Sequence, residues 1–196
     1  MRRRKHVLVL NGHPDSRPER FAHALASAYA RGAREAGHDV RIVHIGSLQF
    51  PLLRTATDFE QGKPPTVIAG CQADLRQADH VVVVFPLWLG AMPALLKGYF
   101  EQVLRPGFAF EYGKRKLARK LLKGKSARVV VTMGMPAALY RWAYRAHSLK
   151  SLERNILGFC GIRVVGHDVI GLMGEPKAGR RERWLAKMEQ LGRRAA

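Results

Sequence analysis

A segment near the start of the chain carries four side chains that suit the binding of an anion. It follows an apolar run at 7–10, and its Ser16-Arg17-Pro18-Glu19 sequence is typical of the first turn of a helix. The free N–H groups of such a turn attract anions, so the segment predicts a site for a phosphate monoester. The four side chains belong to His13, Ser16, Arg17 and Arg20. The alternative is that Ser16 only caps the helix while the arginines are solvated.

Other sequence features argue against two nucleotide-binding motifs and against a cysteine metal site. No Gly-x-Gly-x-x-Gly follows the first expected strand, so a Rossmann NAD domain is not expected. Gly124-Lys125-Ser126 resembles the end of a P-loop, but Arg119 stands where the first glycine is required, and the triplet enters a strand instead of a helix. Cys71 and Cys160 lie 89 positions apart with no companion at metal-ligand spacing, so no metal site is expected.

Apolar runs and helical patterns alternate along the chain, and these elements must position the candidate residues. Strands are expected at 7–10, 40–43, 81–85, 127–132 and 163–170, and helices at 16–37, 66–77, 93–106, 139–157 and 180–191. This alternation predicts an α/β fold, with a parallel sheet covered by helices on both faces, in one domain over 1–196. Ligands of such sheets bind beyond the carboxyl ends of the strands. The loops at 11–16, 86–92 and 133–138 are therefore the expected binding segments.

The composition is that of a folded protein that favours anionic partners. Of its 196 residues 47% are hydrophobic, and 34 Lys and Arg against 15 Asp and Glu give a net charge of +19. This charge favours anionic ligands, acidic surfaces or nucleic acid. Nucleic acid is the weakest of these, because no aromatic-rich stacking sheet or recognition helix is evident. The apolar run at 7–10 is too short for a signal peptide or a membrane span, so a cytoplasmic location is expected.

Several blocks of sequence, spread over nearly the whole chain, form an ordered set. They are Asn11-Gly12-His13-Pro14-Asp15, Phe85-Pro86-Leu87-Trp88, the run from Met92 to Val103, Phe108-Ala109-Phe110 and Gly158-Phe159-Cys160-Gly161. Together they resemble the flavodoxin-like NAD(P)H:quinone oxidoreductases. The resemblance implies a flavodoxin-like sheet of five parallel strands in the order 2-1-3-4-5. It also implies a flavin, FMN or FAD, that is bound without a covalent link.

The resemblance further implies which residues hold that flavin. Its phosphate would lie near the first helix and its ring on the loop after the third strand, with other contacts from the loop after the fourth. The implied cofactor-binding residues are His13, Ser16, Arg20, Phe21, Pro86, Leu87, Trp88, Leu89, Thr132, Met133, Gly134 and Met135. The first loop is longer than the commoner family pattern, with Ala22 in place of an Asn, and Met133-Gly134-Met135 replaces the frequent Thr-Gly-Gly.

Tyr140 and His147 are the candidate catalytic residues. They lie seven positions apart, which places them on one face of the helix expected at 139–157. In the resembled family a Tyr and a His in this region stabilise charge as hydride arrives. A phenol or an imidazole can donate a hydrogen bond to a developing quinol oxygen. The alternative is that both residues, with Trp142 and Tyr144, form an aromatic packing face or a dimer face.

The activity that the resemblance implies is transfer of a hydride from NADPH or NADH, through FMN or FAD, to a quinone-like acceptor. Nucleotide and acceptor would use one pocket in turn, which gives ping-pong kinetics. Family members place the flavin ring between two subunits, so a homodimer is expected. The alternative function is a flavin-binding ancillary subunit of a membrane transporter, such as a potassium-efflux system.

A basic loop at 111–128 is the densest run of positive charge. Its cations are Lys114, Arg115, Lys116, Arg119, Lys120, Lys123, Lys125 and Arg128, against one acidic residue. Leu117, Leu121 and Leu122 give it a partly helical apolar face, which predicts a short lid beside the flavin loops. Such a loop would attract a dinucleotide phosphate, an acidic protein or a membrane surface. The alternative is a solvated loop with no special role.

Overall fold

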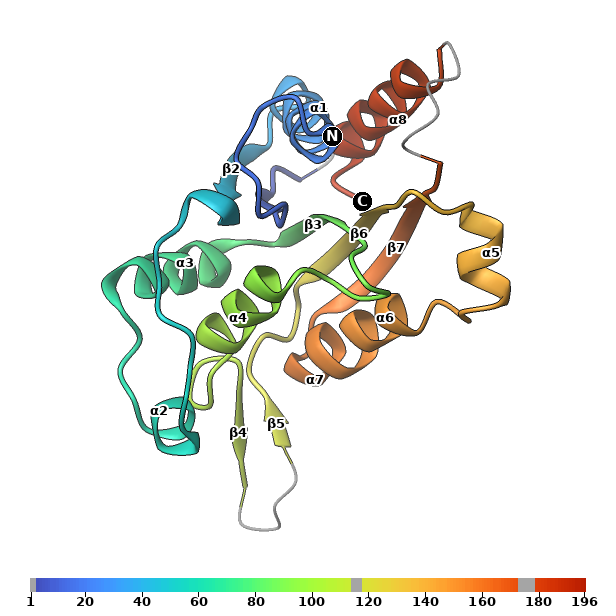
Figure 1. Ribbon diagram of the computed structural model, residues 1–196. Helices are drawn as coiled ribbons and strands as arrows, with labels where there is room; N and C mark the ends of the chain where they lie inside the picture. Colours follow the sequence, from blue (N-terminus) through green and yellow to red (C-terminus); the bar gives the residue numbers. More distant parts are fainter. Residues whose placement is uncertain (1–2, 114–117, 173–178) are drawn as a thin grey trace.

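Five parallel strands run through the centre of the computed structural model, which describes residues 3–113, 118–172 and 179–196 (Figure 1). They are β1 (His6–Asn11), β2 (Asp39–His44), β3 (His80–Pro86), β6 (Ser126–Thr132) and β7 (Arg163–Ile170). Their order across the sheet is β2-β1-β3-β6-β7, and every neighbouring pair is parallel. Counted among the five expected strands this is the order 2-1-3-4-5, so the predicted flavodoxin-like topology is confirmed.

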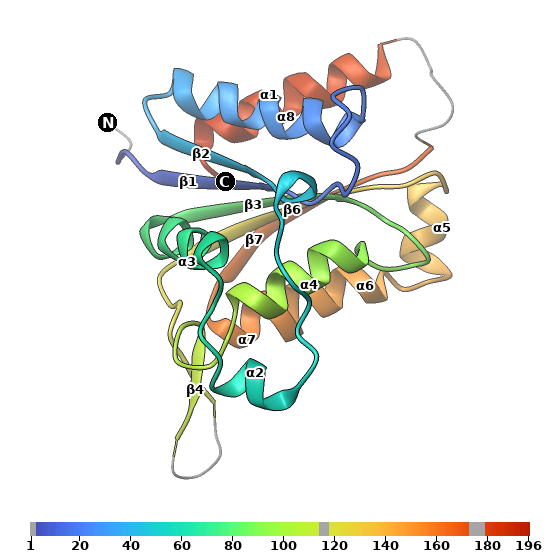
Figure 2. The ribbon, with the colours of Figure 1, turned by 60° about the vertical axis from the view of Figure 1, so that its left-hand side comes forward.

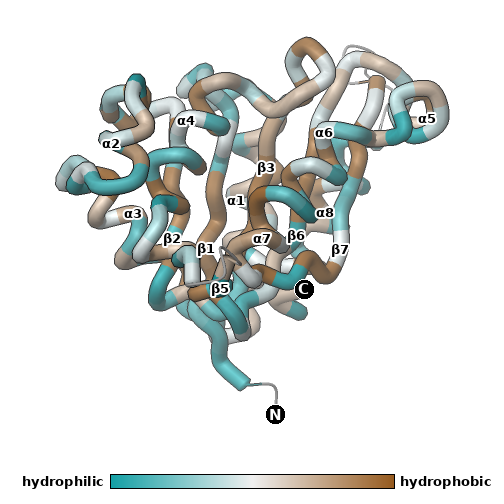
Figure 3. Tube along the Cα trace, turned by 90° about the horizontal axis from the view of Figure 1, so that it is seen from below, coloured by the Kyte–Doolittle hydropathy of each residue, from teal (hydrophilic) through white to brown (hydrophobic). Residues whose placement is uncertain are grey.

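Helices pack on both faces of this sheet (Figure 2). One face carries α1 (Phe21–Glu35) and α8 (Arg180–Arg194), and the other carries α3 (Thr66–Gln77) and α4 (Ala94–Val103) together with the helical turns that follow β6. Side chains of β3 alternate between the two resulting cores: Val81, Val83 and Phe85 point to the α3 and α4 side, and Val82 and Val84 to the α1 and α8 side. Burial on both faces explains the apolar runs of the inner strands β1, β3 and β6, which Figure 3 colours as hydrophobic.

The first helix begins later than its sequence suggests. α1 starts at Phe21, and its N-cap residue is Arg20, which makes no side-chain cap. Ser16 is exposed and does not cap this helix, so that expectation was wrong. The Asp15 carboxylate accepts a hydrogen bond from the Arg17 N–H at 3.0 Å and from the Arg17 side chain, and these local bonds hold the segment as a loop.

The helix expected at 139–157 is broken into two stretches. The first is α5 (Ala137–Trp142), and the second is a continuous run of α6 (His147–Lys150), the π-helix η2 (Ser151–Leu157) and α7 (Gly158–Cys160). Arg145 and Ala146 have φ values of 48° and 50°, in the left-handed region, which interrupts a right-handed helix. Tyr140 and His147 therefore do not share one helix face, contrary to the expectation.

The basic loop forms a β-hairpin, not a helical lid. β4 (Phe110–Tyr112) pairs antiparallel with β5 (Ala118–Lys120), and the hairpin projects from the body of the protein (Figure 1). The chain then enters the amino end of β6, whereas the expected binding loops leave carboxyl ends. The loop is thus not beside the flavin loops, and this expectation was also wrong. Lys114, Arg115, Lys116 and Leu117 lie outside the described residues.

Short elements complete the connection between β2 and α3, which the sequence left irregular. They are η1 (Ile45–Ser47) and α2 (Ala56–Glu60), and the Thr55 side chain caps α2 by accepting from the Asp58 N–H. None of the helices in the described ranges is long and apolar enough to cross a membrane.

Candidate functional site

A cleft opens at the carboxyl edge of the sheet, where β1, β3 and β6 end. Its volume is about 360 Å³. It is lined by His13, Glu19, Arg20, Phe21, Ala22, Pro86, Leu87, Trp88, Thr132, Met133, Gly134 and Arg181. The loop N–H of Leu87 donates to the Thr132 carbonyl at 2.7 Å, and the N–H of Met133 donates to that of Ile170 at 2.9 Å. These bonds extend the sheet's pairing into the loops and fix the floor of the cleft.

Most of the predicted cofactor-binding residues line this cleft, and their contact with a cofactor stays a prediction. Ser16, Leu89 and Met135 are not among the lining residues. Arg181 lines the cleft but was not predicted, because it comes from the last helix, far away in the sequence. Its guanidinium lies 4.8 Å from the centre of the Phe21 ring, a cation–π contact that joins α8 to the start of α1. Glu19 and Ala22, which neighbour predicted residues, were missed as well.

A tight turn after β3 presents Trp88 to the cleft. Trp88 and Ala91 exchange backbone hydrogen bonds, both at 2.9 Å. The residues between them, Leu89 and Gly90, have φ values of 47° and 76°. A leucine in the left-handed region is strained, and the Leu89 side chain is also fully exposed. Trp88 is half exposed, and its ring stands edge-on to the His13 ring, with 5.9 Å between the two ring centroids. Strain beside an exposed aromatic ring is typical of a binding loop.

The other end of the cleft is suited to an anion. The first turn of α1 has neither a side-chain cap nor an acidic residue, so the positive end of its dipole faces the cleft without a countercharge on the helix. The His23 N–H donates to the Arg20 carbonyl at 2.9 Å. Arg20 and Arg181 add two positive charges to the lining, which also includes the acidic Glu19. The Nε of Arg20 donates to the Asp15 carboxylate at 2.6 Å, which fixes the guanidinium at the mouth of the helix. The Arg17 N–H and side chain lower the pKa of Asp15, so the carboxylate that accepts from Arg20 is ionised at neutral pH.

His13 is held in a defined tautomer at the same end. Its Nδ1 accepts a hydrogen bond from the Asp15 N–H at 3.0 Å. In the neutral ring the remaining proton is therefore on Nε2, which makes that atom a donor. Burial, followed by the nearby His23, lowers the pKa of His13 and favours this neutral form.

A chain of hydrogen bonds supports His13 from behind. The buried Asn11 accepts from the His13 N–H at 3.2 Å, and its amide nitrogen lies 2.8 Å from His23 Nδ1. His23 Nε2 in turn lies 2.9 Å from the Asp15 carbonyl. The ring of His44 stacks on that of His23 at 5.5 Å. Residues of β1, β2 and α1 thus fix the loop that carries His13.

Tyr140 and His147 lie outside the residues that line the cleft. The Tyr140 side chain is only 1% exposed, and its hydroxyl accepts from the Leu149 N–H at 3.2 Å. Burial raises the pKa of Tyr140. His147 is exposed at the start of α6. In the single chain Tyr140 is therefore a packing residue that ties α5 to α6.

Two curated relatives match most of the chain. A Haemophilus influenzae protein named "Uncharacterized NAD(P)H oxidoreductase" is 27% identical over 168 residues, which cover 84% of this chain and 82% of that protein. "NAD(P)H dehydrogenase (quinone) 1" of Rattus norvegicus is 28% identical over 154 residues, which cover 74% of this chain and 55% of that protein. The chain thus spans about half the length of the rat relative.

Two further relatives match shorter stretches with higher identity. "FMN-dependent NADH:quinone oxidoreductase 3" of Pseudomonas aeruginosa is 36% identical over 102 residues, 52% of this chain and 44% of that protein. "Glutathione-regulated potassium-efflux system ancillary protein KefG" of Cronobacter sakazakii is 46% identical over 70 residues, 36% of this chain and 35% of that protein.

A solved structure and a family profile agree over almost the entire chain. The NAD(P)H:quinone oxidoreductase from Methanothermobacter marburgensis has a TM-score of 0.82 and 25% identity, and the match covers 99% of this chain and 100% of that one. The family of the flavodoxin-like fold matches residues 5–191. The chain therefore belongs to this flavodoxin-like family.

Proposed function

We propose that this protein is an NAD(P)H:quinone oxidoreductase that uses FMN. The observation that carries the proposal is the cleft itself, in which the apolar side chains of Pro86, Leu87 and Trp88 and two arginines against one glutamate meet at the edge where flavodoxin-like sheets bind their ligand. The names of the Haemophilus, rat and Pseudomonas relatives support the activity, and the last of them supports FMN.

The residues of the cleft fit the two ends of FMN. Pro86, Leu87 and Trp88 offer the apolar surface that a flavin ring requires. The uncapped start of α1, with Arg20, offers N–H groups and a positive charge for a phosphate. A bound flavin supplies the hydride chemistry, accepting two electrons from NAD(P)H and giving them to a quinone.

The chain's own residues bind, orient and exclude water. Trp88 and Leu87 would keep solvent from the ring, and Nε2–H of His13 can donate a hydrogen bond to a bound anion or carbonyl. Because one cleft would serve nucleotide and acceptor in turn, we propose ping-pong kinetics. The catalytic roles of Tyr140 and His147 remain proposals. The buried Tyr140 would act by positioning α6, and the exposed His147 would donate a hydrogen bond to the acceptor.

We further propose that two copies of the chain form a dimer that completes the substrate pocket. The fully exposed Leu89 stands beside Trp88 in the strained turn, and Trp142 on α5 is 84% exposed. Large apolar side chains left in solvent are typical of surfaces that a partner covers. The expected symmetry is two-fold, the commonest in homo-oligomers.

A second candidate function is that of an ancillary subunit of a potassium-efflux system. It rests on the 46% identity to KefG, a match that covers about a third of each chain. The two functions differ in what the isolated protein does. Turnover of a quinone without a transporter favours the enzyme, and flavin binding without turnover favours the subunit.

Flavin binding by the purified protein tests the assignment of the cleft. Addition of the protein to FMN should quench the flavin fluorescence with saturation at micromolar protein. Trp88→Asp should weaken the quenching, because it places a negative charge in the cleft that would receive the ring and the anionic phosphate. Absence of quenching by the folded wild-type protein would contradict the proposed function.

A further inference from the structure

A second hollow lies at the opposite edge of the sheet, where the strands begin. Its volume is about 560 Å³, larger than that of the cleft. It is lined by Arg3, Lys5, Asp79, Lys123, Gly124, Lys125, Ser126, Gly161 and Arg163. These residues come from the segments that lead into β1, β3, β6 and β7, so parts of the chain far apart in sequence converge on it.

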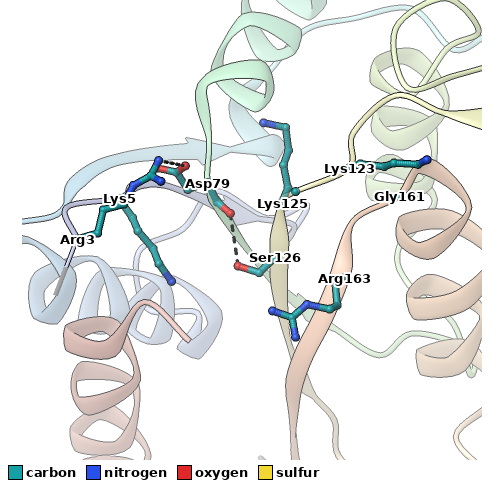
Figure 4. A pocket seen from close by; sticks show the side chains of 9 residues that line it. Arg3, Lys5, Asp79, Lys123, Lys125, Ser126, Gly161 and Arg163 are labelled. Atoms are coloured by element: carbon teal, nitrogen blue, oxygen red, sulfur yellow. Dashed lines mark hydrogen bonds and ion pairs between the residues drawn. The ribbon is translucent and has the colours of Figure 1, made fainter.

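The lining of this hollow is strongly positive. Five of its side chains are cationic and only Asp79 is acidic, which leaves a formal net charge of +4. Figure 4 shows Arg3 and Lys5 on one side of Asp79 and Ser126, and Lys123, Lys125 and Arg163 on the other. Asp79 is already engaged, because its carboxylate accepts from the His6 N–H at 2.9 Å and lies 3.5 Å from Arg3. Its charge also raises the pKa of Lys125 on the other side, so it offsets one of the five cations.

Backbone carbonyl groups hold two of the cations in place. Lys125 Nζ donates to the carbonyls of Arg76 at 2.8 Å and Ala78 at 2.7 Å, and Lys5 Nζ donates to that of Ala195 at 2.9 Å. Carbonyl dipoles orient an ammonium group but carry no net negative charge. Burial and the nearby Arg76 lower the pKa of Lys125, while Asp79 opposes this shift.

The remaining cations on that side are free to contact a ligand. Lys123 and Arg163 are exposed, and neither side chain makes a hydrogen bond or an ion pair with any residue in the described ranges. Between the cations lies the Ser126 hydroxyl, whose oxygen is 2.8 Å from His80 Nδ1. The hollow thus combines fixed charges, free charges and a fixed hydroxyl.

We propose that this hollow binds a small anion with two phosphate groups, at a site separate from the flavin cleft. Guanidinium groups pair with phosphate oxygens in a bidentate manner, and Arg3 and Arg163 stand on its two sides, so each can serve one phosphate. A diphosphate also carries enough charge to offset the excess of positive charge. The concave shape favours a small molecule over a membrane surface, which is flat. The inference stands independently of the proposed function.

Calorimetric titration with inorganic pyrophosphate tests this site. The protein is first saturated with FMN so that the cleft is occupied, and one pyrophosphate per chain should then bind. The double variant Lys123→Gln/Arg163→Gln should weaken binding at least about tenfold, because it removes two charge-assisted hydrogen bonds. The matched control Arg54→Gln/Lys63→Gln removes the same charge from the exposed connection before α3 and should retain nearly wild-type affinity. Circular dichroism of both variants checks the fold.

Three outcomes would overturn the proposal. The first is that pyrophosphate does not bind the FMN-loaded wild-type protein. The second is equal weakening in both double variants, which would mean that only the overall charge attracts the anion. The third is that Lys123→Gln/Arg163→Gln abolishes binding to phosphatidylserine vesicles but leaves pyrophosphate affinity intact, which would make the surface a membrane contact. Weaker binding of orthophosphate than of pyrophosphate would support two phosphate positions.

Discussion

Asp15 organises the anion end of the cleft although it does not line it. Its N–H sets the tautomer of His13, its carbonyl lies 2.9 Å from His23 Nε2, and its carboxylate holds Arg17 and Arg20. One residue thus fixes a hydrogen-bond donor and a positive charge relative to the start of α1. Only Arg20 of the two arginines lines the cleft.

This difference between Arg17 and Arg20 predicts opposite results for two similar variants. Arg20→Gln should raise the dissociation constant of FMN at least about tenfold, because a hydrogen bond to a charged group contributes about 1.5–3 kcal/mol. Riboflavin, which lacks the phosphate, should bind both forms equally. Arg17→Gln removes the same charge and should have little effect on either ligand. Equal losses for FMN and riboflavin on Arg20→Gln would show that Arg20 does not serve the phosphate.

His80, at the start of β3, makes the stability of the protein depend on pH. The side chain is fully buried, and burial, with Lys5 and Arg128 nearby, lowers its pKa from 6.5 to about 3. Between pH 6.5 and pH 3, His80 therefore binds a proton in the unfolded chain but stays neutral in the folded chain. The stability from a neutral His80 is complete above pH 6.5 and is lost as the pH falls toward 3, by about 1.4 kcal/mol per pH unit.

Urea unfolding at two pH values measures this contribution. Between pH 7.5 and pH 5 the wild-type protein should lose about 2 kcal/mol more unfolding free energy than His80→Gln, which cannot titrate. His13 and His44, whose pKa values are also lowered by burial, contribute equally to both proteins and cancel in the difference. The same loss in both proteins would mean that His80 does not titrate in the expected way.

Local sequence predicted the cleft residues that follow a strand directly, and it missed those fixed by distant contacts. His13 and Trp88 come two positions after the ends of β1 and β3, so their place at the carboxyl edge follows from the strand pattern. Arg181 reaches the cleft only because α8 packs on α1, a contact between the two ends of the chain. Ser16 had the pattern of a cap, but bonds within the Asp15–Arg17 segment hold it as a loop, and the helix begins later, at Phe21.

At the scale of elements, the packing of α8 on α1 depends on two glycines. A Cβ atom at Gly32 would overlap the Glu189 carbonyl, and one at Gly192 would overlap the Tyr29 carbonyl. The two helix backbones therefore approach too closely for any side chain at these positions. Because α8 carries Arg181, this crossing also sets one wall of the cleft.

Gly192→Ala should lower the unfolding free energy by about 3 kcal/mol, since backbone must move to relieve the overlap. Gly70→Ala is the matched control, because Gly70 is an exposed position within α3 where a Cβ atom meets nothing within 4 Å. That change should stabilise the protein by about 0.5–1 kcal/mol through helix propensity. Chemical denaturation of both variants checks the pair, and a neutral Gly192→Ala would refute the close crossing.

The inner strands β1, β3 and β6 were predictable because both of their faces are largely buried, which requires apolar runs. Two other elements were not predictable in this way. Leu121 and Leu122 suggested a helical face, but the chain before them pairs as the β4–β5 hairpin, and the spacing of leucines does not reveal pairing between strands. The helix break at Arg145 and Ala146 contains neither glycine nor proline, the residues that usually mark a helix end in a sequence.

At the scale of the whole molecule, the predicted dimer can be tested through Trp142. Light scattering should give twice the mass of one chain, and Trp142→Glu should shift the protein toward monomer. The unfolding free energy of the monomer should change little, because this side chain is already 84% exposed. Val165→Glu, at an exposed position on the edge strand β7, is the control that should remain dimeric. A wild-type monomer with full quinone reductase activity would contradict the dimer.

The positive charge of the molecule gathers at both edges of the sheet. Arg20 and Arg181 stand at the carboxyl edge, and the hollow lined by Lys123, Lys125 and Arg163 stands at the amino edge. The described part of the basic loop belongs to the amino edge, so its charges do not line the cleft. Salt should therefore weaken anion binding at each edge without coupling the two, since screening acts over about 10 Å at 0.1 M.

Anaerobic mixing of the FMN-loaded protein with NADPH or NADH, followed by a simple benzoquinone, tests the proposed quinone reductase activity. At least one nucleotide should bleach the yellow absorbance of the bound flavin, and the quinone should restore it within the time of one catalytic turnover. Failure of both nucleotides to bleach a stoichiometrically bound flavin would contradict an NAD(P)H:quinone oxidoreductase. The protein would then be a flavin-binding subunit without this activity.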